Sequence, residues 1–315
     1  MPNTIIQTFL TQLMLAKESS FQTATTVGGA SIAAKNPKAN EIFESLYDQG
    51  YRGHAAMDFA YYQGVGHSEI DLPDMWFYAD DYGHFFMAML GTDTATTSAS
   101  STSHAITLLD GLPPSYTLTD YNGVDTRQYA GLYFEEVAMK WTNPGRLTLS
   151  AKAQGMTASS ANKPSFPAYS SASVYLPWEM ASTISGSANP RIINMEASLK
   201  RKVEPVWGMT NSQQPNLGSD GPLQITGKID FAVADNTELN YYKNNSQPAA
   251  TFLLTGASTI NTMTIHFNSL AFETPTVIDR TKDFLVLQST YRGIYNATDA
   301  GPVKVTLTNA RTASY

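Results

Sequence analysis

The sequence predicts a mainly β protein made of two copies of one β-rich domain, each with a short α-helix. The first observation is the stretch Tyr129–Gly155, in which two alternating runs, Leu132–Trp141 and Arg146–Ala153, flank a turn at Asn143-Pro144-Gly145. Proline presets the φ that such a turn needs, and glycine accepts a positive φ without steric strain. The second observation is that residues 262–292 repeat this order, with a long alternating strand, a proline-bearing turn and a shorter strand.

The third observation is the order of elements in the two halves of the chain. Each half reads strand, loop, strand, short helix, strand and long hairpin, with a period of about 150 residues, which is too long for a solenoid. We therefore predict a first β domain over residues 1–155, a linker over 156–175 that is rich in Ser, Ala and Pro, and a second β domain over 176–315.

In the first half, residues 22–50 and 92–103 are expected to be loops, with one helical turn within the first of them at Glu41–Tyr47. A helix is expected at about 81–90, because its apolar residues share one face, acidic residues precede it and Gly91 follows it. Residues 5–16 could be helix or strand, and their β-prone residues favour strand. The remaining predicted strands are 53–63, 67–72, 104–109 and 114–121.

In the second half, a long loop is expected over 205–222 and a short helix over 236–244. Leu223–Phe231 alternates cleanly and reads as a half-buried strand. The other predicted strands are 194–201, 248–255 and 302–308, in addition to the hairpin described above.

The composition excludes several classes of function. The net charge is −7 and charged residues make up only 15% of the 315 residues, which argues against tight binding to a phosphate backbone. No cysteine is present, so neither a disulfide framework nor a thiolate zinc site is expected. The N-terminal stretch lacks a basic region, a cleavage signature and a membrane span, so we expect a soluble protein without an export signal.

No group of residues indicates catalysis. The chain lacks a nucleophile elbow, a metalloprotease motif and a phosphate-binding loop, and its five histidines are scattered. The densest polar group runs from His67 to His84 and could hold calcium, but it lacks calcium-loop spacing, and a helix start explains Asp80 and Asp81. We predict no catalytic residues, no metal and no cofactor; a glycosidase would need two facing carboxyl groups in a cleft.

The opening Ala16–Ala24 (AKESSFQTA) resembles the "KE-T-T-(aromatic)-G-T" opening of the tail tube proteins of long-tailed, siphovirus-like bacteriophages. Gln22 stands where that family has glycine. The order of a helix closing in Met89-Leu90-Gly91, then Pro114–Leu118, then the Gly131–Trp141 strand is also similar. The resemblance covers residues 10–155 directly and 180–315 only through the repeat.

This resemblance implies that each copy folds as a β-sandwich or half-barrel with one α-helix on its flank. It also implies a structural virion protein of the phage tail, assembled in the host cytoplasm. Such proteins form rings that stack into a tube conducting the genome, so self-association and contacts with tape measure, tail-tip and tail-terminator proteins are implied. The DNA would pass without specific binding, and no membrane is involved. Two domains per chain would make a homotrimeric ring with pseudo-sixfold symmetry. The alternative is a decoration, tail-tip or adhesin module that binds a sugar or receptor through an exposed aromatic platform.

The polar faces of the repeated strands are the candidate lining of the channel. The acidic balance of the chain suits a wall along which DNA slides. The loops 22–50 and 205–222 are expected to bridge neighbouring rings or subunits. The candidate lumen residues are Asp58, Glu136, Gln224, Thr226, Lys228, Asp230, Thr264 and His266.

Overall fold

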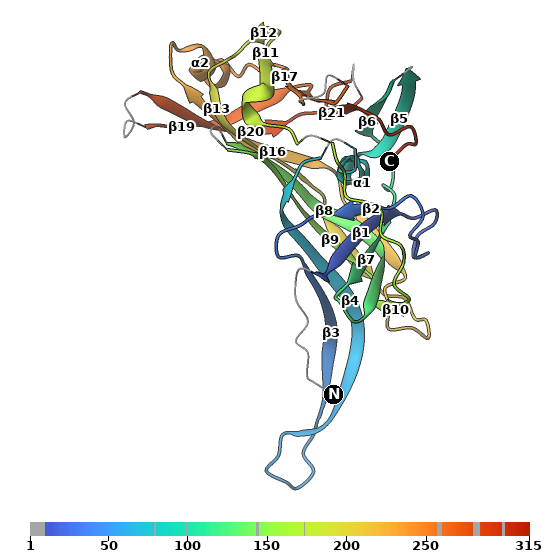
Figure 1. The fold of residues 1–315 in the computed structure, drawn as a ribbon. Coiled ribbons are helices and arrows are strands. Elements are labelled where there is room, and N and C mark those ends of the chain that lie inside the picture. Colours follow the sequence, from blue (N-terminus) through green and yellow to red (C-terminus); the bar gives the residue numbers. More distant parts are fainter. Residues whose placement is uncertain are drawn as a thin grey trace.

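Two β-sheets and one long protruding hairpin account for most of the described chain (Figure 1). The structure is a computed structural model that describes residues 10–78, 80–98, 100–142, 145–172, 174–256, 260–279, 284–297 and 300–315. The mainly β fold class is confirmed. Several parts of the sequence predictions lie outside the described residues: the start of the 5–16 segment, Asn143-Pro144 of the central turn, residue 99 of the 92–103 loop, residue 173 of the linker and residues 280–283 of the stretch 262–292.

Eight strands of the larger, twelve-stranded sheet lie side by side, all antiparallel. In spatial order they are β3 (Lys38–Gln49), β4 (Asp58–Trp76), β9 (Leu147–Gly155), β8 (Thr126–Thr142), β13 (Ile192–Lys200), β16 (Gln224–Ala232), β20 (Val286–Gly293) and β19 (Leu270–Asp279). The first part of β8 pairs instead with β7 (Tyr116–Tyr121) and β10 (Ser159–Ala161), and β7 leads on to β1 (Gln12–Lys17) and β2 (Ala30–Ile32).

The second sheet has seven strands and contains elements from both halves of the chain. In order they are β12 (Ser187–Ala188), β11 (Met180–Ile184), β17 (Ala250–Thr255), β18 (Thr262–Phe267), β21 (Val303–Asn309), β6 (Ser101–Leu108) and β5 (Gly91–Ser98). A separate small hairpin joins β14 (Val203–Val206) to β15 (Leu217–Asp220). The helices of the described part are α1 (Gly83–Leu90), α2 (Thr237–Lys243) and the 3-10 turn η2 (Pro177–Glu179).

Strand alternation places one side of the large sheet in the core. In β8, Val137, Met139 and Trp141 are buried, whereas Lys140 points to the opposite side and is exposed. Because a slip of one residue would bring the polar side into the core, this pattern fixes the register of the sheet. Helix α1 lies within the same core and all eight of its residues are buried.

The two halves contribute strands to the large sheet in the same order. The first half supplies β3, β4, β9 and β8, and the second supplies β13, β16, β20 and β19. If the four strands of each set are numbered in chain order, both sets have the spatial order first, second, fourth, third. A bulge also recurs: the register shifts between Phe134 and Glu136 in β8 and between Phe272 and Thr274 in β19. A helix follows the second strand in both halves. The strand order of the large sheet is therefore the same in the two halves of the chain.

Two loop predictions are wrong. The segment 22–50 contains β2 and the twelve-residue strand β3, so Glu41–Tyr47 is extended and not helical. Most of β3 is exposed, and its pairing with β4, far along the chain, supplies the hydrogen bonds that its own sequence does not announce. The segment 92–103 contains most of β5 and the start of β6, whose threonines favour strand over loop.

Smaller differences concern the second half and the linker. The linker 156–175 contains β10, and the 205–222 loop holds β15 and the end of β14. The proline-bearing turn predicted within 262–292 is wrong, because Pro275 lies inside β19, a strand at the edge of the sheet, where proline is tolerated. The central hairpin, both helices and the closing strand are confirmed within a few residues.

Candidate functional site

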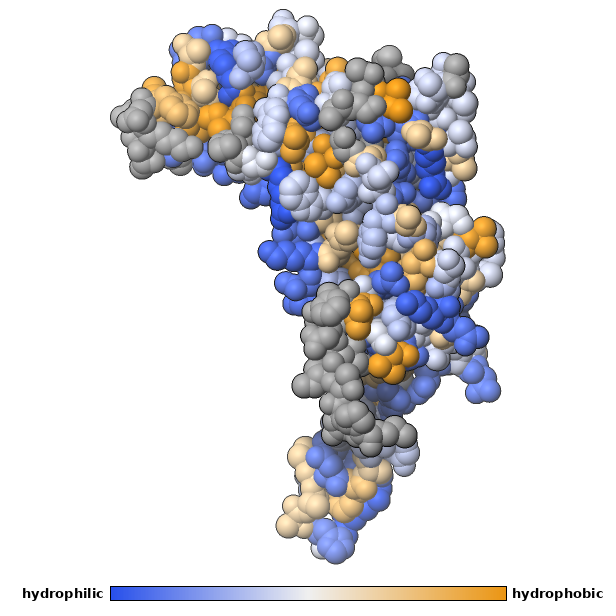
Figure 2. Space-filling view, viewed as in Figure 1, coloured by the Kyte–Doolittle hydropathy of each residue, from blue (hydrophilic) through white to orange (hydrophobic). Residues whose placement is uncertain are grey.

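The side of the large sheet that faces away from the core forms a continuous polar surface, which we call the polar face. It is built from the alternate residues of β8, β9, β13, β16 and β20, and Figure 2 shows hydrophilic residues gathered on the concave side of the body below β16 and β19. A groove of about 690 Å³ runs across it. Its charged and hydroxyl members include Glu136, Lys140, Thr148, Ser150, Glu196, Ser198, Thr226, Lys228 and Thr290.

Charges of opposite sign alternate across the strands of the polar face. Lys140 on β8 lies 2.6 Å from Glu196 on β13, and Lys200 on β13 lies 3.1 Å from Glu136 on β8. Both pairs bridge the seam where the first half of the chain meets the second. The polar face therefore presents matched charges rather than a field of one sign.

Glu136 shows how this matching acts on a single carboxylate. Partial burial raises its pKa, but the hydroxyl of Ser198, at 2.6 Å, and the ammonium of Lys200 favour the ionised form, so the pKa lies below its usual value. Glu136 is thus ionised and held in place at neutral pH. On β16, Lys228 lies 3.7 Å from Asp230, as expected for two residues on one face of a strand.

The structure separates the predicted lumen residues into three groups. Glu136, Gln224, Thr226, Lys228 and Asp230 lie on strands of the polar face. Thr264 and His266 lie on β18 in the seven-stranded sheet, and Asp58 lies near the end of the protruding hairpin, at the start of β4. The eight residues therefore do not share one surface.

The outer side of the seven-stranded sheet differs in chemistry from the polar face. Its alternate residues on β17, β18 and β21 are mostly threonines, and we call it the hydroxyl face. His266 accepts or donates a hydrogen bond with Thr251 through Nδ1 at 2.8 Å and pairs in register with Lys304 of β21. Its other members are Leu253, Thr255, Thr262, Thr264, Thr306 and Thr308.

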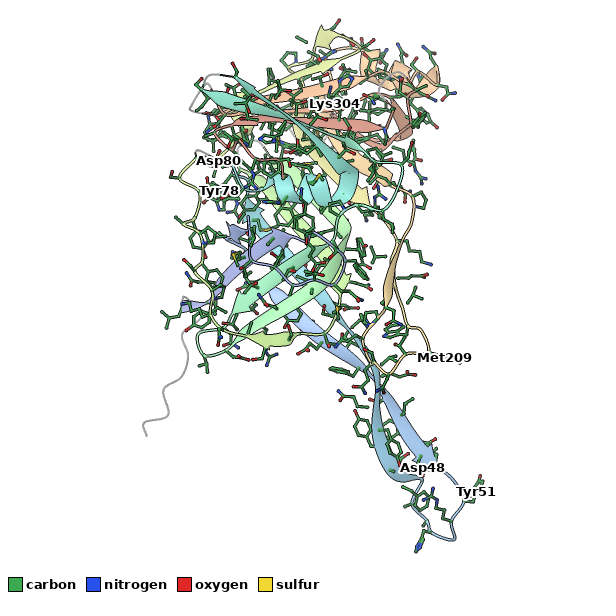
Figure 3. The ribbon with its side chains drawn as sticks, turned by 90° about the vertical axis from the view of Figure 1, so that its right-hand side faces the viewer. Asp48, Tyr51, Tyr78, Asp80, Met209 and Lys304 are labelled. Atoms are coloured by element: carbon green, nitrogen blue, oxygen red, sulfur yellow. The ribbon has the colours of Figure 1, made fainter. Side chains whose placement is uncertain are left out.

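A third surface is the end of the β3–β4 hairpin, which we call the arm and define as Ser45–Gln63. The arm projects beyond the body of the molecule, with Asp48 and Tyr51 near its tip (Figures 1 and 3). Tyr47 and Tyr61 pack across its two strands with ring centres 5.5 Å apart. Its exposed large apolar residues are Leu46, Tyr47, Tyr51, Met57, Tyr61 and Tyr62.

The arm was not predicted from the sequence, because 38–49 was assigned to a loop. One signal could have revealed it: residues 38–49 contain neither proline nor glycine, and they precede the alternating run 53–63 across a short turn. An exposed aromatic cluster on a two-stranded hairpin is unusual for a monomer, because such hairpins are only marginally stable in water. It indicates a surface that is covered in an assembly.

The two ends of the eight-strand run are open sheet edges in the described part of the chain. At one end lies β19, which pairs with β20 alone, and at the other lies β3, which pairs with β4 alone. An open edge carries unpaired backbone N–H and C=O groups and is a template for pairing with another chain. Both edges belong to the sheet that carries the polar face.

Neither a metal-ligand cluster nor a membrane-spanning helix is found among the described residues. They contain no group of three His, Asp or Glu placed to hold a metal ion. In the predicted acidic segment, Asp74 instead pairs with Arg146 at 2.6 Å, and Arg146 stacks over Trp76. Across these same ranges, no helix has the length and apolar character to cross a membrane.

A comparison with protein-family models matches residues 8–309 to the family described as phage tail tube protein. A search of curated proteins finds no match. The family match spans nearly the whole chain, including both sheets, the arm and the seam between the halves. The chain belongs to the phage tail tube protein family, as its sequence resemblance indicated.

Proposed function

We propose that this tail tube protein closes into rings of three chains, which stack into the tube through which the phage genome is ejected. The observation that carries the proposal is the internal seam between β8 and β13, which joins two like sets of four strands and leaves the corresponding edges, β19 and β3, open. A second chain can repeat the seam by pairing its β3 with β19 of the first. Three chains would supply six sets of strands.

The internal seam also supplies a register for the contact between chains. In the seam, Glu136 of β8 is opposite Lys200 of β13. The bulge that recurs in β8 and β19 places Thr274 of β19 at the position that Glu136 has in β8. The pairing of β3 with β4 and of β13 with β16 places Ile42 of β3 at the position that Lys200 has in β13. We therefore expect Thr274 of one chain to lie opposite Ile42 of the next.

Cysteine cross-linking tests this register, and the chain has no cysteine of its own to interfere. Oxidation of assemblies of the Ile42→Cys, Thr274→Cys variant should give covalent trimers as the largest product on a non-reducing gel. The Leu46→Cys, Thr274→Cys variant is the control, because its second cysteine lies four residues along β3, beyond disulfide reach. Covalent hexamers would contradict the three-chain ring, and equal cross-linking of the control would contradict the register.

In this ring the polar face lines the channel. Its paired charges and hydroxyl groups leave no cluster of cations to hold DNA phosphates, which favours passage without binding. The arm and its aromatic residues are the contact to the next ring. The ends of the stacked tube would meet the tail-tip, tape measure and terminator proteins of the virion.

Charge reversal distinguishes the polar face from the hydroxyl face. Phage particles carrying Glu136→Lys and Asp230→Lys should assemble tails but eject DNA more slowly at low salt. The added cations attract phosphates over the Debye length, which grows from about 8 Å at physiological salt to about 30 Å at about 0.01 M salt. The control variant Thr264→Lys, His266→Lys also introduces two lysines, on the hydroxyl face, and should eject at the wild-type rate. Slow ejection by the second variant alone would assign the channel to the other sheet.

A further inference from the structure

The segment between β13 and β16 holds the same place in the second half as the arm holds in the first. The arm joins the first and second strands of its set, and residues 201–223 join the first and second strands of theirs. The second segment does not project as a free hairpin. Figure 3 shows it lying beside the base of the arm, with Met209 next to the narrow part where the arm leaves the body.

Backbone and side-chain hydrogen bonds attach this segment to the base of the arm and to the adjoining part of β4. The Gly66 N–H of β4 donates to the Gln213 carbonyl at 3.0 Å, and the Gln213 Nε2 group donates to the Gln63 carbonyl at 2.9 Å. The Gly66 N–H and the Gln63 carbonyl, both on β4, lie beside the register irregularity between Phe43 and Ser45 of β3. A bulge bends a strand pair and increases its twist, so this is where a two-stranded ribbon would flex.

The next two residues attach the segment to the body. The Thr157 N–H donates to Gln214 Oε1 at 2.9 Å, and the Gln214 Nε2 group donates back to the Thr157 hydroxyl. The Pro215 carbonyl accepts a hydrogen bond from the Gln22 side chain, and Pro215 is buried. Three consecutive residues thus contact the arm, the end of β9 and the turn after β1.

The turn that carries Gln22 is itself held rigidly by Glu18. The Glu18 carboxylate is buried and accepts four hydrogen bonds, which saturates most of its acceptor capacity. One of them comes from the Gln22 N–H at 3.0 Å, although Gln22 has a positive φ of 65°. The other donors are the hydroxyls of Ser115 and Thr117 and the N–H of Gly131.

We infer that Gln213–Pro215 forms a clasp that sets the angle of the arm relative to the body, with Gln213 and Gln214 as its positioning residues. The arm beyond the clasp is a two-stranded ribbon, and such ribbons need support from a third element to hold one geometry. The second-half counterpart of the arm supplies that support. Consequently each chain presents one arm and one clasp rather than two arms.

The consequence for assembly rests on the function proposed above. If three chains form a ring, the ring presents three arms to its neighbour, so stacking has threefold rather than sixfold symmetry. A clasp that holds the arm at a fixed angle before contact reduces the ordering needed when rings meet, and preorganisation of this kind strengthens association.

Distance measurement in the unassembled chain tests the clasp independently of tube formation. Spin labels at Tyr51→Cys near the arm tip and Val124→Cys on the body report the arm angle by pulsed dipolar spectroscopy, and both positions are exposed. The Gln213→Ala, Gln214→Ala variant should shift or broaden the distance distribution. Asn211→Ala is the matched control, because Asn211 lies in the same loop and makes none of the clasp bonds; it should leave the distribution unchanged.

A second variant, deletion of residues 207–219, removes the clasp completely and should broaden the distribution further while thermal unfolding remains cooperative. Distributions identical to the wild type in both variants would overturn the inference. Tube formation by the same proteins, followed by electron microscopy, is a separate readout. If wild-type protein forms no tubes, the proposed function fails and the distance result still decides whether the clasp positions the arm.

Discussion

The helices α1 and α2 occupy corresponding places in the two halves, yet their surroundings differ. Each follows the second strand of its set, β4 or β16. All eight residues of α1 are buried, whereas in α2 only Glu238 is. Helix α1 packs against β8, β5 and β6, and α2 packs against β19.

This difference follows from the β5–β6 hairpin, which comes directly after α1. Through β6 the hairpin joins β21 of the seven-stranded sheet, so α1 is enclosed between the two sheets. The β17–β18 hairpin that follows α2 joins the same sheet, but a connection over residues 244–249 separates it from the helix, and α2 packs mainly against β19. A repeated order of strands therefore does not imply equal burial, and equivalent substitutions in the two halves should have unequal effects.

The largest expected difference is in the helices themselves. Phe86→Ala in α1 removes a side chain that is completely buried and should lower the free energy of unfolding by about 3–5 kcal/mol. Leu239→Ala in α2 removes a partly buried side chain and should cost about 1 kcal/mol. Urea unfolding of both variants measures the contrast. Equal losses would show that α1 is not the more important helix for stability.

The second contrast concerns Glu18 and Ser185, which follow β1 and β11. The Glu18 N–H donates a hydrogen bond to the Ser115 carbonyl at 2.9 Å, and the Ser185 N–H donates the corresponding bond to the Ala249 carbonyl at 2.8 Å. Glu18→Ala leaves several donors without their acceptor and should lower the free energy of unfolding by about 3 kcal/mol. Ser185 is exposed, so Ser185→Ala should change it by less than about 0.5 kcal/mol. Chemical denaturation compares them; a small effect of Glu18→Ala would contradict its role.

The third contrast is in pH dependence before each helix. Burial, aided by the Asp80 charge, raises the pKa of Asp81 to about 6, whereas the Thr237 hydroxyl and N–H lower the pKa of Asp235 to about 2. The contribution of Asp81 to the stability of the folded protein is therefore present at low pH and lost as pH rises through about 6. The contribution of Asp235 to stability is present above the pKa that this aspartate has in the unfolded chain, and it is lost only as pH falls toward about 2.

Thermal unfolding between about pH 4 and about pH 6 separates the two aspartates. Relative to Asp81→Asn, the wild type should lose stability as pH rises across this window. The difference in stability between the wild type and the Asp235→Asn variant should stay constant over the same window. A constant difference for Asp81→Asn would mean that its carboxyl is already ionised at the lower pH.

The smallest expected effect is at the seam between the halves. The Lys140–Glu196 pair is about half exposed, so its coupling energy should be about 0.2–1 kcal/mol. A double-mutant cycle of Lys140→Ala and Glu196→Ala, repeated at low and high salt, measures it. Coupling that vanishes in salt is expected of a solvated pair. Coupling well above this range would show that the seam depends on charge as well as on backbone pairing.

The sequence alone determined the local elements that carry a strong period. The alternation in Leu132–Trp141 and Leu223–Phe231 predicted both strands and identified Glu136 and Lys228 as polar-side residues, because side chains in a strand point to opposite sides in turn. The apolar stripe of 81–90 predicted α1. The element order predicted from the two halves is the same in each, and the strand order of the large sheet recurs as well.

Only the tertiary structure decided which strands share a sheet. Alternation separates an inner from an outer side but does not distinguish one sheet from another, so Thr264 and His266 were grouped with the strand 223–231 although they lie on the hydroxyl face. The arm and the clasp were invisible for a related reason. Their geometry depends on hydrogen bonds between residues such as Gly66 and Gln213, which are far apart in the chain, and local sequence patterns carry no record of such pairings.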